Sequence, residues 1–168
     1  MEYRKLGKSD LELSAITYGA FAIGGNMWGG NEKKDSIDSV KASIDNGVTT
    51  LDTAPFYGFG LSEEMIGAAI QGYDRTKIQV LTKFGLVWDG SNQGKGEFFF
   101  DAEEAGKTIP VYKYASKASV IQEVENSLKR LRTDYIDLLQ IHWPDSTTPI
   151  SETMEALDLL LQQGKIRA

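Results

Sequence analysis

The sequence predicts an α/β fold in which parallel strands alternate with helices. Four short segments are apolar or rich in β-branched residues, which favours buried strands, and they cover residues 15–19, 48–53, 78–84 and 136–141. Between and after these segments, apolar residues recur at spacings of three and four, which is the helical period. Strands that alternate with helices through short links form a parallel sheet with right-handed crossovers.

Four helices are expected to accompany these strands. The first and the last are expected to end at Gly47 and Gly164, because glycine readily takes the left-handed conformation that follows a helix. Ser62 is expected to cap the second helix. Ser119 and Gln122 have the spacing of a capping box, which predicts the start of the third helix.

Two further segments stand outside this alternation. A turn at residues 7–9 is flanked by residues 3–5 and 11–13 and predicts a small leading hairpin. The connection over residues 85–115 is polar, contains glycine and carries three consecutive phenylalanines at 98–100. Connections longer than about 15 residues are usually functional or mobile. We therefore expect a substrate loop or lid here, with a disordered segment as the alternative.

The composition limits the class of protein. The 168 residues suffice for one compact domain, and 41% hydrophobic with 25% charged residues is ordinary for a globular protein. A net charge of −6 disfavours a nucleic-acid partner. Cysteine is absent, which excludes disulfides and thiolate ligands, and no metal site is predicted. A charged N-terminus and the lack of an apolar run of about 20 residues predict a cytoplasmic protein with no membrane span.

Polar side chains sit at the expected carboxyl ends of three successive strands. Asp52 ends the second strand and is followed by Tyr57 in a loop, Lys83 ends the third strand, and His142 ends the fourth. Neighbouring strands lie about 4.8 Å apart, so these four side chains can converge within about 10 Å.

These residue types suit the reduction of a carbonyl by hydride. The developing alkoxide must receive a proton, which Tyr57 could donate, and a nearby ammonium such as Lys83 would favour the resulting phenolate. Asp52 would keep Lys83 charged and in place, while His142 could orient or polarise the carbonyl oxygen.

Each of the four residues also has a purely structural interpretation. Alone, His142 would be a hydrogen-bonded core histidine, Lys83 a solvated strand end, Asp52 a turn cap and Tyr57 a packing residue in a glycine-rich loop. Only their joint placement at one end of the strands indicates chemistry.

Several motifs make the sequence resemble one family. Residues 51–58, LDTAPFYG, resemble the aldo-keto reductase signature Asp-Thr-Ala-x-x-Tyr-Gly, and Thr82-Lys83 matches the family's strand-three lysine. Residues 128–144, LKRLRTDYIDLLQIHWP, are similar to the stretch that leads to the family's histidine. Residues 25–30 and 164–168 resemble bacterial members linked to general stress and inositol metabolism.

The resemblance implies an NADPH-dependent oxidoreductase that reduces aldehydes or ketones on a TIM (β/α)₈ barrel. Its catalytic tetrad would be Asp52, Tyr57, Lys83 and His142, with Tyr57 as the proton donor. Residues 1–168 would form the N-terminal half of a single barrel domain, with about the first four βα units and an N-terminal hairpin.

The resemblance also implies cofactor and substrate contacts. Gly19, Ala20 and Phe21 occupy the place where the family's first strand meets the nicotinamide ribose, with Asp52 beside them. Ala20 lacks the hydroxyl that many members carry at its position. The expected substrate pocket is aromatic and comprises Trp28, Phe56, Trp88 and Trp143. Together with Phe21, these rings favour an apolar carbonyl substrate, although Trp143 could equally serve core packing.

Two other patterns resemble dinucleotide motifs and are interpreted as coincidences. Gly58 and Gly60 follow a strand, but Glu63 stands where the third glycine of that fingerprint belongs. Tyr73 and Lys77 have the Tyr-x-x-x-Lys spacing of short-chain dehydrogenases, yet they fall in a polar link rather than on one helix face.

The length sets the main alternative. A (β/α)₈ barrel takes about 250 residues, so we expect a truncated reductase whose open strand edges require a C-terminal half or a homo-oligomer. Residues 165–168 would begin the fifth strand. A catalytically silent scaffold or redox-sensing subunit that keeps the barrel fold is the competing function.

Overall fold

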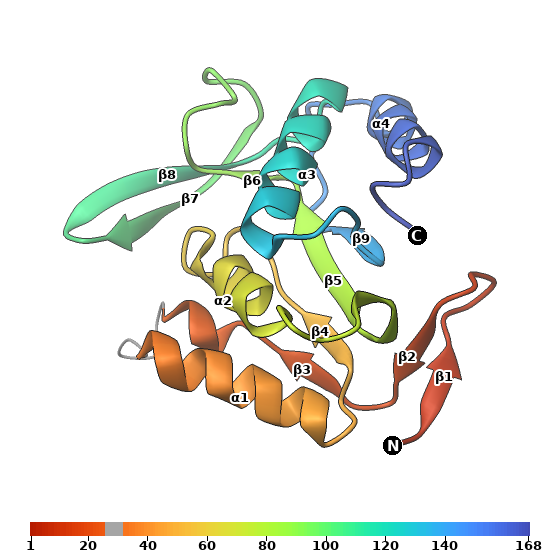
Figure 1. The fold of residues 1–168 in the computed structure, drawn as a ribbon. Helices are drawn as coiled ribbons and strands as arrows, with labels where there is room; N and C mark the ends of the chain where they lie inside the picture. Colours follow the sequence, from red (N-terminus) through yellow and green to blue (C-terminus); the bar gives the residue numbers. More distant parts are fainter. Residues whose placement is uncertain (26–31) are drawn as a thin grey trace.

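The computed structural model of the chain describes residues 1–25 and 32–168 (Figure 1). It opens with the predicted antiparallel hairpin, whose strands are β1 (Tyr3–Lys5) and β2 (Glu12–Ser14). A parallel sheet of four strands follows, made of β3 (Thr17–Gly19), β4 (Thr50–Asp52), β5 (Gln79–Phe84) and β9 (Leu138–Ile141).

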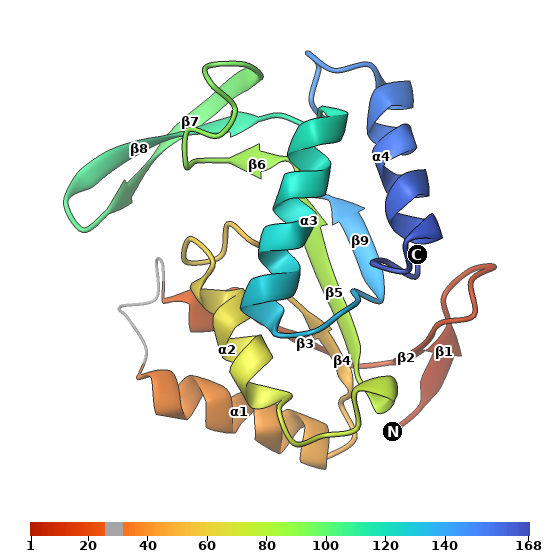
Figure 2. The same ribbon diagram turned by 45° about the horizontal axis from the view of Figure 1, so that its top comes forward.

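The strand order in this sheet is the order of the chain, β3-β4-β5-β9. Right-handed crossovers that all step in the same direction place every helix on the same face of the sheet. The helices on that face are α1 (Lys33–Asp45), α2 (Leu61–Ala69), α3 (Lys117–Leu131) and α4 (Ile150–Gln162), as Figure 2 shows. This sequential winding is that of a (β/α)₈ barrel, which confirms the predicted fold class.

The C-terminal residues continue the same pattern. Ile166 pairs in parallel with Ile136, and the backbone N–H of Leu139 donates to the carbonyl of Ala168 over 2.9 Å. A fifth strand therefore begins beside β9, as the sequence predicts. The main core lies between the sheet and its helices, and its fully buried members include Leu51, Ile66, Val80, Phe84, Val120, Leu131 and Leu160.

The connection after β5 differs from the sequence prediction. Most of it is regular, with β6 (Leu86–Val87), β7 (Glu97–Glu104) and β8 (Lys107–Lys113) in an antiparallel sheet of order β6-β8-β7. The prediction of a loop was wrong here. Strands β7 and β8 form a long hairpin that projects from the carboxyl end of β5 (Figure 1). Ala105 and Gly106 connect them, and both have positive φ, as tight hairpin turns require.

Two predicted helix caps were also wrong. The residue before α2 is Gly60, and Ser62 lies inside the helix, where its hydroxyl donates to the carbonyl of Ala20 over 2.7 Å. Helix α3 begins after Ser116, whose side chain accepts the N–H of Ser119. Gly47 and Gly164, in contrast, follow their helices with the predicted positive φ, of 85° and 69°.

A buried ion pair connects α2, α3 and β5. Glu63 is fully buried, and one of its carboxylate oxygens accepts from Arg130 Nε over 2.7 Å. The other oxygen accepts the hydroxyl of Thr82 over 2.6 Å. Arg130 also packs against Gly60, where an added Cβ would lie 2.8 Å from the arginine Cδ. Glu63 therefore anchors the helices directly behind the strand that carries Lys83.

Removing the arginine of this pair is expected to destabilise the fold. In Arg130→Met the carboxylate of Glu63 stays buried without a cation, and breaking such a pair costs about 3 kcal/mol or more. The double variant Arg130→Met/Glu63→Gln removes the charge as well and should recover much of that loss. Urea unfolding of the three proteins gives the free energies of unfolding. A cost below about 1 kcal/mol for the single variant, typical of an exposed pair, would contradict this role.

Candidate functional site

The register of the parallel sheet places polar residues at one edge. Asp52 is the last residue of β4 and pairs with Leu81 of β5, and Lys83 pairs with Gln140 of β9. His142 directly follows β9, and its N–H donates to the carbonyl of Phe84 over 2.9 Å. The carboxyl ends of three neighbouring strands thus bring these side chains together, as the sequence predicts.

An ion pair occupies the centre of this edge. Lys83 Nζ lies 2.8 Å from Asp52 Oδ1 and 2.8 Å from the carbonyl oxygen of Thr53. The lysine side chain is only 14% exposed and the aspartate side chain 30%. Successive strand residues point to opposite faces. Lys83 therefore points away from the helices, while Thr82 points toward Glu63 on the helical side.

Tyr57 reaches the ion pair from the loop between β4 and α2. Lys83 Nζ lies 4.9 Å from the centroid of its ring. His142 meets the same ring edge to face at 5.6 Å between centroids, and Phe21 does so at 4.9 Å. No described residue forms a hydrogen bond with the Tyr57 hydroxyl, so the ring is fixed by its faces while its hydroxyl is left for other partners.

The environment of His142 keeps its imidazole neutral. Burial and, to a smaller extent, the positive charge of Lys83 lower the pKa of His142, the carboxylate of Asp52 opposes the shift, and the net pKa is about 4. A neutral imidazole has one N–H to donate and one nitrogen that accepts. At neutral pH His142 can therefore donate a hydrogen bond to an oxygen near Tyr57 without adding a second cation beside Lys83.

A close backbone contact positions the loop of Tyr57. Gly58 has φ of 63°, and a Cβ added there would lie 2.1 Å from the carbonyl oxygen of Gly24. A Cβ added at Gly24 would lie 2.8 Å from the carbonyl carbon of Tyr57. Both positions thus require glycine, and their contact holds the loop after β3 against the peptide that carries Tyr57.

The three residues predicted to contact a cofactor flank the site. Gly19 ends β3 and pairs with Asp52. The N–H of Ala20 donates to the carbonyl of Asp52 over 2.8 Å, and Ala20 itself is fully buried. Phe21 is 39% exposed and packs on Tyr57. The structure thus places all three beside the Asp52–Lys83 pair.

The predicted pocket aromatics divide into separate groups. Trp28 lies outside the described residues. Phe56 and Trp88 contact each other at 5.7 Å between ring centroids, in a second core cluster beneath the β7–β8 hairpin. Trp143 follows His142, is 46% exposed, and contacts Phe99 of β7 at 5.1 Å. Among the predicted pocket residues that the structure describes, Trp143 directly follows His142 in the chain, whereas Phe56 and Trp88 pack in the second core cluster.

The sequence prediction missed several residues that shape this face. Phe99 belongs to a run of three phenylalanines that was noticed, but not as part of a strand. Lys113 lies 4.8 Å from the Phe99 ring centroid and pairs with Glu97 over 2.7 Å. Glu97 also accepts the Ser146 hydroxyl over 2.6 Å. The hairpin is therefore fastened to the loop that carries His142.

The two dinucleotide-like patterns are explained by other contacts. Glu63, at the missing glycine position, forms the buried pair with Arg130. The hydroxyl of Tyr73 donates to Asp45 of α1 over 2.9 Å, and Lys77 lies in a separate short 3₁₀ helix.

Fold and site together define a β/α-barrel protein whose polar residues gather at the carboxyl ends of its strands. The sequence profile of the Aldo/keto reductase family matches residues 15–168. The chain belongs to this family.

Curated relatives show both the similarity and its extent. The chain is 45% identical to the aldo-keto reductase YhdN of Bacillus subtilis, over 100% of this chain and 46% of that protein. It is 39% identical to the NADH-specific methylglyoxal reductase of Escherichia coli, over 97% of this chain and 49% of that protein. It is also 33% identical to a probable voltage-gated potassium channel subunit beta of Arabidopsis thaliana, over 98% of this chain and 44% of that protein. The chain spans about half the length of these relatives.

Solved structures agree with the fold. The glycerol dehydrogenase of Gluconobacter oxydans superposes with a TM-score of 0.80 at 41% identity, over 99% of this chain and 46% of that one. An aldo-keto reductase of Klebsiella pneumoniae in complex with NADPH superposes with a TM-score of 0.68 at 31% identity, over 93% of this chain and 44% of that one.

The contact between Gly24 and Gly58 predicts that alanine lowers the free energy of unfolding more at position 58 than at a glycine without close neighbours. Gly58→Ala should destabilise the chain by at least about 1 kcal/mol more than Gly94→Ala, because overpacking adds about 1–3 kcal/mol to the strain of a left-handed alanine. Gly94 is a matched control, with φ of 76° and no atom within 4 Å of an added Cβ. The free energies of unfolding in urea measure the difference, and equal costs would contradict the contact.

The pKa of His142 provides a direct test of the charge arrangement. The chain contains a single histidine, so its ring resonances can be followed by NMR without assignment ambiguity. We expect a titration midpoint near pH 4. Lys83→Met should raise this midpoint and Asp52→Asn should lower it, because the two charges act in opposite directions. A midpoint near the ordinary value of about 6.5 would show that the ring is solvated.

Proposed function

We propose that this chain carries the proton-donating part of a carbonyl reductase site, with Tyr57 as the donor. The proposal rests mainly on one observation: the ammonium of Lys83 lies between the carboxylate of Asp52, at 2.8 Å, and the ring of Tyr57, at 4.9 Å. A cation held beside a phenol stabilises the phenolate that remains after the proton has left. Asp52 keeps that cation in place without contacting the donor itself.

His142 takes the orienting role in this proposal. Its ring lies edge to face with Tyr57, and its low pKa leaves it neutral. A neutral imidazole donates a hydrogen bond to the carbonyl oxygen and so directs that oxygen toward the Tyr57 hydroxyl. Donors aimed at an oxygen on which charge develops stabilise the transition state. Lys83 contributes a positive charge beside the phenol ring.

The residues around Gly19 fit a nicotinamide cofactor. A bound nicotinamide dinucleotide supplies the hydride for such a reduction. An added Cβ at Gly19 would meet no atom within 4 Å, so the end of β3 presents open space beside Asp52. Phe21 adds an exposed apolar ring next to Tyr57. We propose that Gly19 and Phe21 contact the nicotinamide end while the buried Ala20, predicted to contact it as well, only supports them from behind, and that NADPH is the cofactor, as in the Klebsiella pneumoniae complex.

Two lysines on this face of the sheet are already engaged. Lys83 is engaged by Asp52 and by the carbonyl of Thr53, and Lys113 by Glu97. Neither lysine is therefore free to pair with a dinucleotide phosphate. We propose that residues 1–168 are the N-terminal half of a single barrel domain, and that a C-terminal half or a second copy completes the site.

The substrate class in this proposal is a small apolar aldehyde or ketone. Phe21, Trp143 and Phe99 provide rings near the site, and Phe99 stacks on Trp143 at 5.1 Å between centroids. Aromatic walls with a few convergent polar groups are typical of small-molecule sites.

Turnover and its loss in one variant test the proposal. The chain should oxidise NADPH in the presence of a reactive aromatic aldehyde, and Tyr57→Phe should lower the rate by about 10²-fold or more, the usual contribution of a general acid. The substitution keeps the ring that contacts Phe21 and His142. Tyr112→Phe, which removes a phenol hydroxyl on β8, is the matched control and should leave the rate unchanged. Equal rates for the chain and Tyr57→Phe would exclude Tyr57 as the donor.

A second function is a scaffold or redox-sensing subunit without turnover. The similarity to a protein named as a potassium channel subunit beta favours it. The absence of aldehyde-dependent NADPH oxidation from both the chain and Tyr57→Phe would contradict reduction by this chain alone, a result that both a scaffold and a site lacking its C-terminal half predict.

A further inference from the structure

Hydrogen bonds around Gly85 hold together the two ends of the insertion that contains β6, β7 and β8. We call these two ends, Gly85 and Tyr114–Ala115, the neck of the insertion. Gly85 links β5 to β6 and has φ of 94°. Its N–H donates to Glu123 Oε2 of α3 over 2.8 Å, and its carbonyl accepts the N–H of Tyr114 over 3.2 Å. The next amide, that of Ala115, donates to Asp145 Oδ2 over 2.9 Å. The two ends of the insertion are thus held together between α3 and the loop after β9.

This neck lies close to the proposed reduction site. Gly85 follows Lys83 by two residues, and a Cβ added at Gly85 would lie 3.6 Å from the carbonyl oxygen of Trp143. The carbonyl of Phe84, the residue between them, accepts the N–H of His142. The conformation of the neck therefore determines where the insertion leaves the sheet relative to His142 and Trp143.

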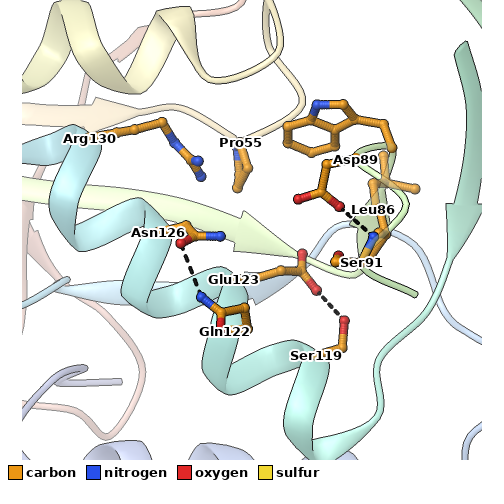
Figure 3. A pocket seen from close by; sticks show the side chains of 11 residues that line it. Pro55, Leu86, Asp89, Ser91, Ser119, Gln122, Glu123, Asn126 and Arg130 are labelled. Carbon is orange, nitrogen blue, oxygen red and sulfur yellow. Dashed lines mark hydrogen bonds between the residues drawn. The ribbon is translucent and has the colours of Figure 1, made fainter. Parts of the chain in front are cut away.

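Glu123 is a side-chain anchor of the neck, and it has no ion-pair partner among the described residues. Figure 3 shows it projecting from α3 into a small cavity of about 30 Å³ between α3 and the start of the insertion. Its second oxygen accepts the Ser119 hydroxyl over 3.1 Å. Arg130 lines the same cavity but donates its Nε to Glu63. The cavity can hold a water molecule, so a proton can reach the carboxyl.

Two charged groups act on this carboxyl besides its burial. Burial and, to a smaller extent, the negative charge of Asp89 raise the pKa of Glu123, to a net value of about 8. The hydrogen bonds from Gly85 and Ser119 and the positive charge of Arg130 oppose this shift. At neutral pH most of the carboxyl is therefore protonated.

We propose that Glu123 is a positioning residue that closes the neck of the insertion only while it is protonated. The neutral carboxyl accepts the Gly85 N–H at one oxygen and donates its own O–H to the Ser119 hydroxyl oxygen at the other, at little desolvation cost. The carboxylate accepts from both Gly85 and Ser119 but loses much of its hydration without gaining a cation. Opening of the neck solvates the carboxylate, so loss of the proton shifts the neck toward the open form.

Proton linkage gives the direction in which the equilibrium between the closed and the open neck changes with pH. The closed neck holds the proton more tightly than an open neck, in which the carboxyl has an ordinary pKa near 4.5. Opening therefore becomes easier as pH rises above about 4.5, and the effect is complete above about 8.

NMR of the ¹⁵N-labelled chain tests this directly. The amide of Gly85 should titrate with a midpoint near pH 8. The exchange protection of the Tyr114 and Ala115 amides, corrected for intrinsic exchange, should fall by at least about tenfold between about pH 6 and 9. The resonances of Trp143 should shift with the same midpoint, which a purely local ionisation would not cause. Because none of these readouts is turnover, the result does not depend on whether the chain reduces carbonyls.

Variants at Glu123 distinguish the effect of its ionisation from the effect of its hydrogen bond with Gly85. Glu123→Gln keeps an oxygen for Gly85 but cannot ionise, so protection of Tyr114 and Ala115 should be high and constant across this pH range. Glu123→Leu offers no acceptor, so protection should be low at every pH. Asp89→Asn should lower the midpoint of Gly85 because it removes a charge that raises the pKa of Glu123.

Glu64→Gln is the control, since Glu64 is an exposed glutamate of α2. It should reproduce the pH profile of the unmodified chain. A midpoint for Gly85 below about pH 6 would overturn the proposal. So would an equal loss of protection in Glu123→Gln, because the loss would then not depend on a proton at this position.

Discussion

The ion pair between Lys83 and Asp52 is the interaction on which the arrangement of the site depends. A lysine that is 14% exposed must be paired, because an ammonium removed from water without a counter-charge is costly. Parallel pairing of β4 with β5 brings the carboxylate within 2.8 Å and so meets this need at the strand ends. The charge fixed in this way also lies over the ring of Tyr57 and lowers the pKa of His142. One electrostatic requirement thus fixes Asp52 and Lys83 together and sets the charge that acts on Tyr57 and His142.

The surrounding backbone keeps those positions through contacts that carry no chemistry. Ser62 ties α2 to the carbonyl of Ala20 and forms a hydrogen bond with Thr53, the residue after Asp52. Gly24 and Gly58 press the loops after β3 and β4 together. The loops of two neighbouring βα units, after β3 and after β4, are therefore fixed to one another, which preorganises the site before any ligand binds.

Local patterns in the sequence predicted the parallel sheet, its helices and the convergence of Asp52, Lys83 and His142. They did so because strand ends and hydrophobic periodicity depend on neighbouring residues alone. The β7–β8 hairpin escaped prediction because Pro110 within a run argues against a strand. In the structure β6 pairs only with Tyr112 and Lys113, so the edge of β8 at Pro110 needs no donor on that side. An alanine at the left-handed turn position 105 concealed the turn as well.

Other errors came from contacts between distant residues. Ser116 and Ser119 are both good caps three residues apart, and local preference does not choose between them. In the sequence Glu63 is notable because it replaces the third glycine of a dinucleotide fingerprint, but its main partner is Arg130, 67 residues away. The anchoring role of Glu123 likewise depends on Gly85, 38 residues earlier. No window of sequence contains such a pair.

Burial shifts two ionisable groups on opposite sides of β5 in opposite directions. His142 binds fewer protons in the folded chain than in the unfolded chain between about pH 4 and 6.5, so its contribution to stability is lost as pH falls through that range. Glu123 binds more protons in the folded chain between about pH 4.5 and 8, so its contribution is lost as pH rises. Where the two ranges overlap, their slopes oppose each other. Between the two folded pKa values both groups are mainly neutral, which leaves Asp52 and Lys83 as the charged pair at the centre of the site.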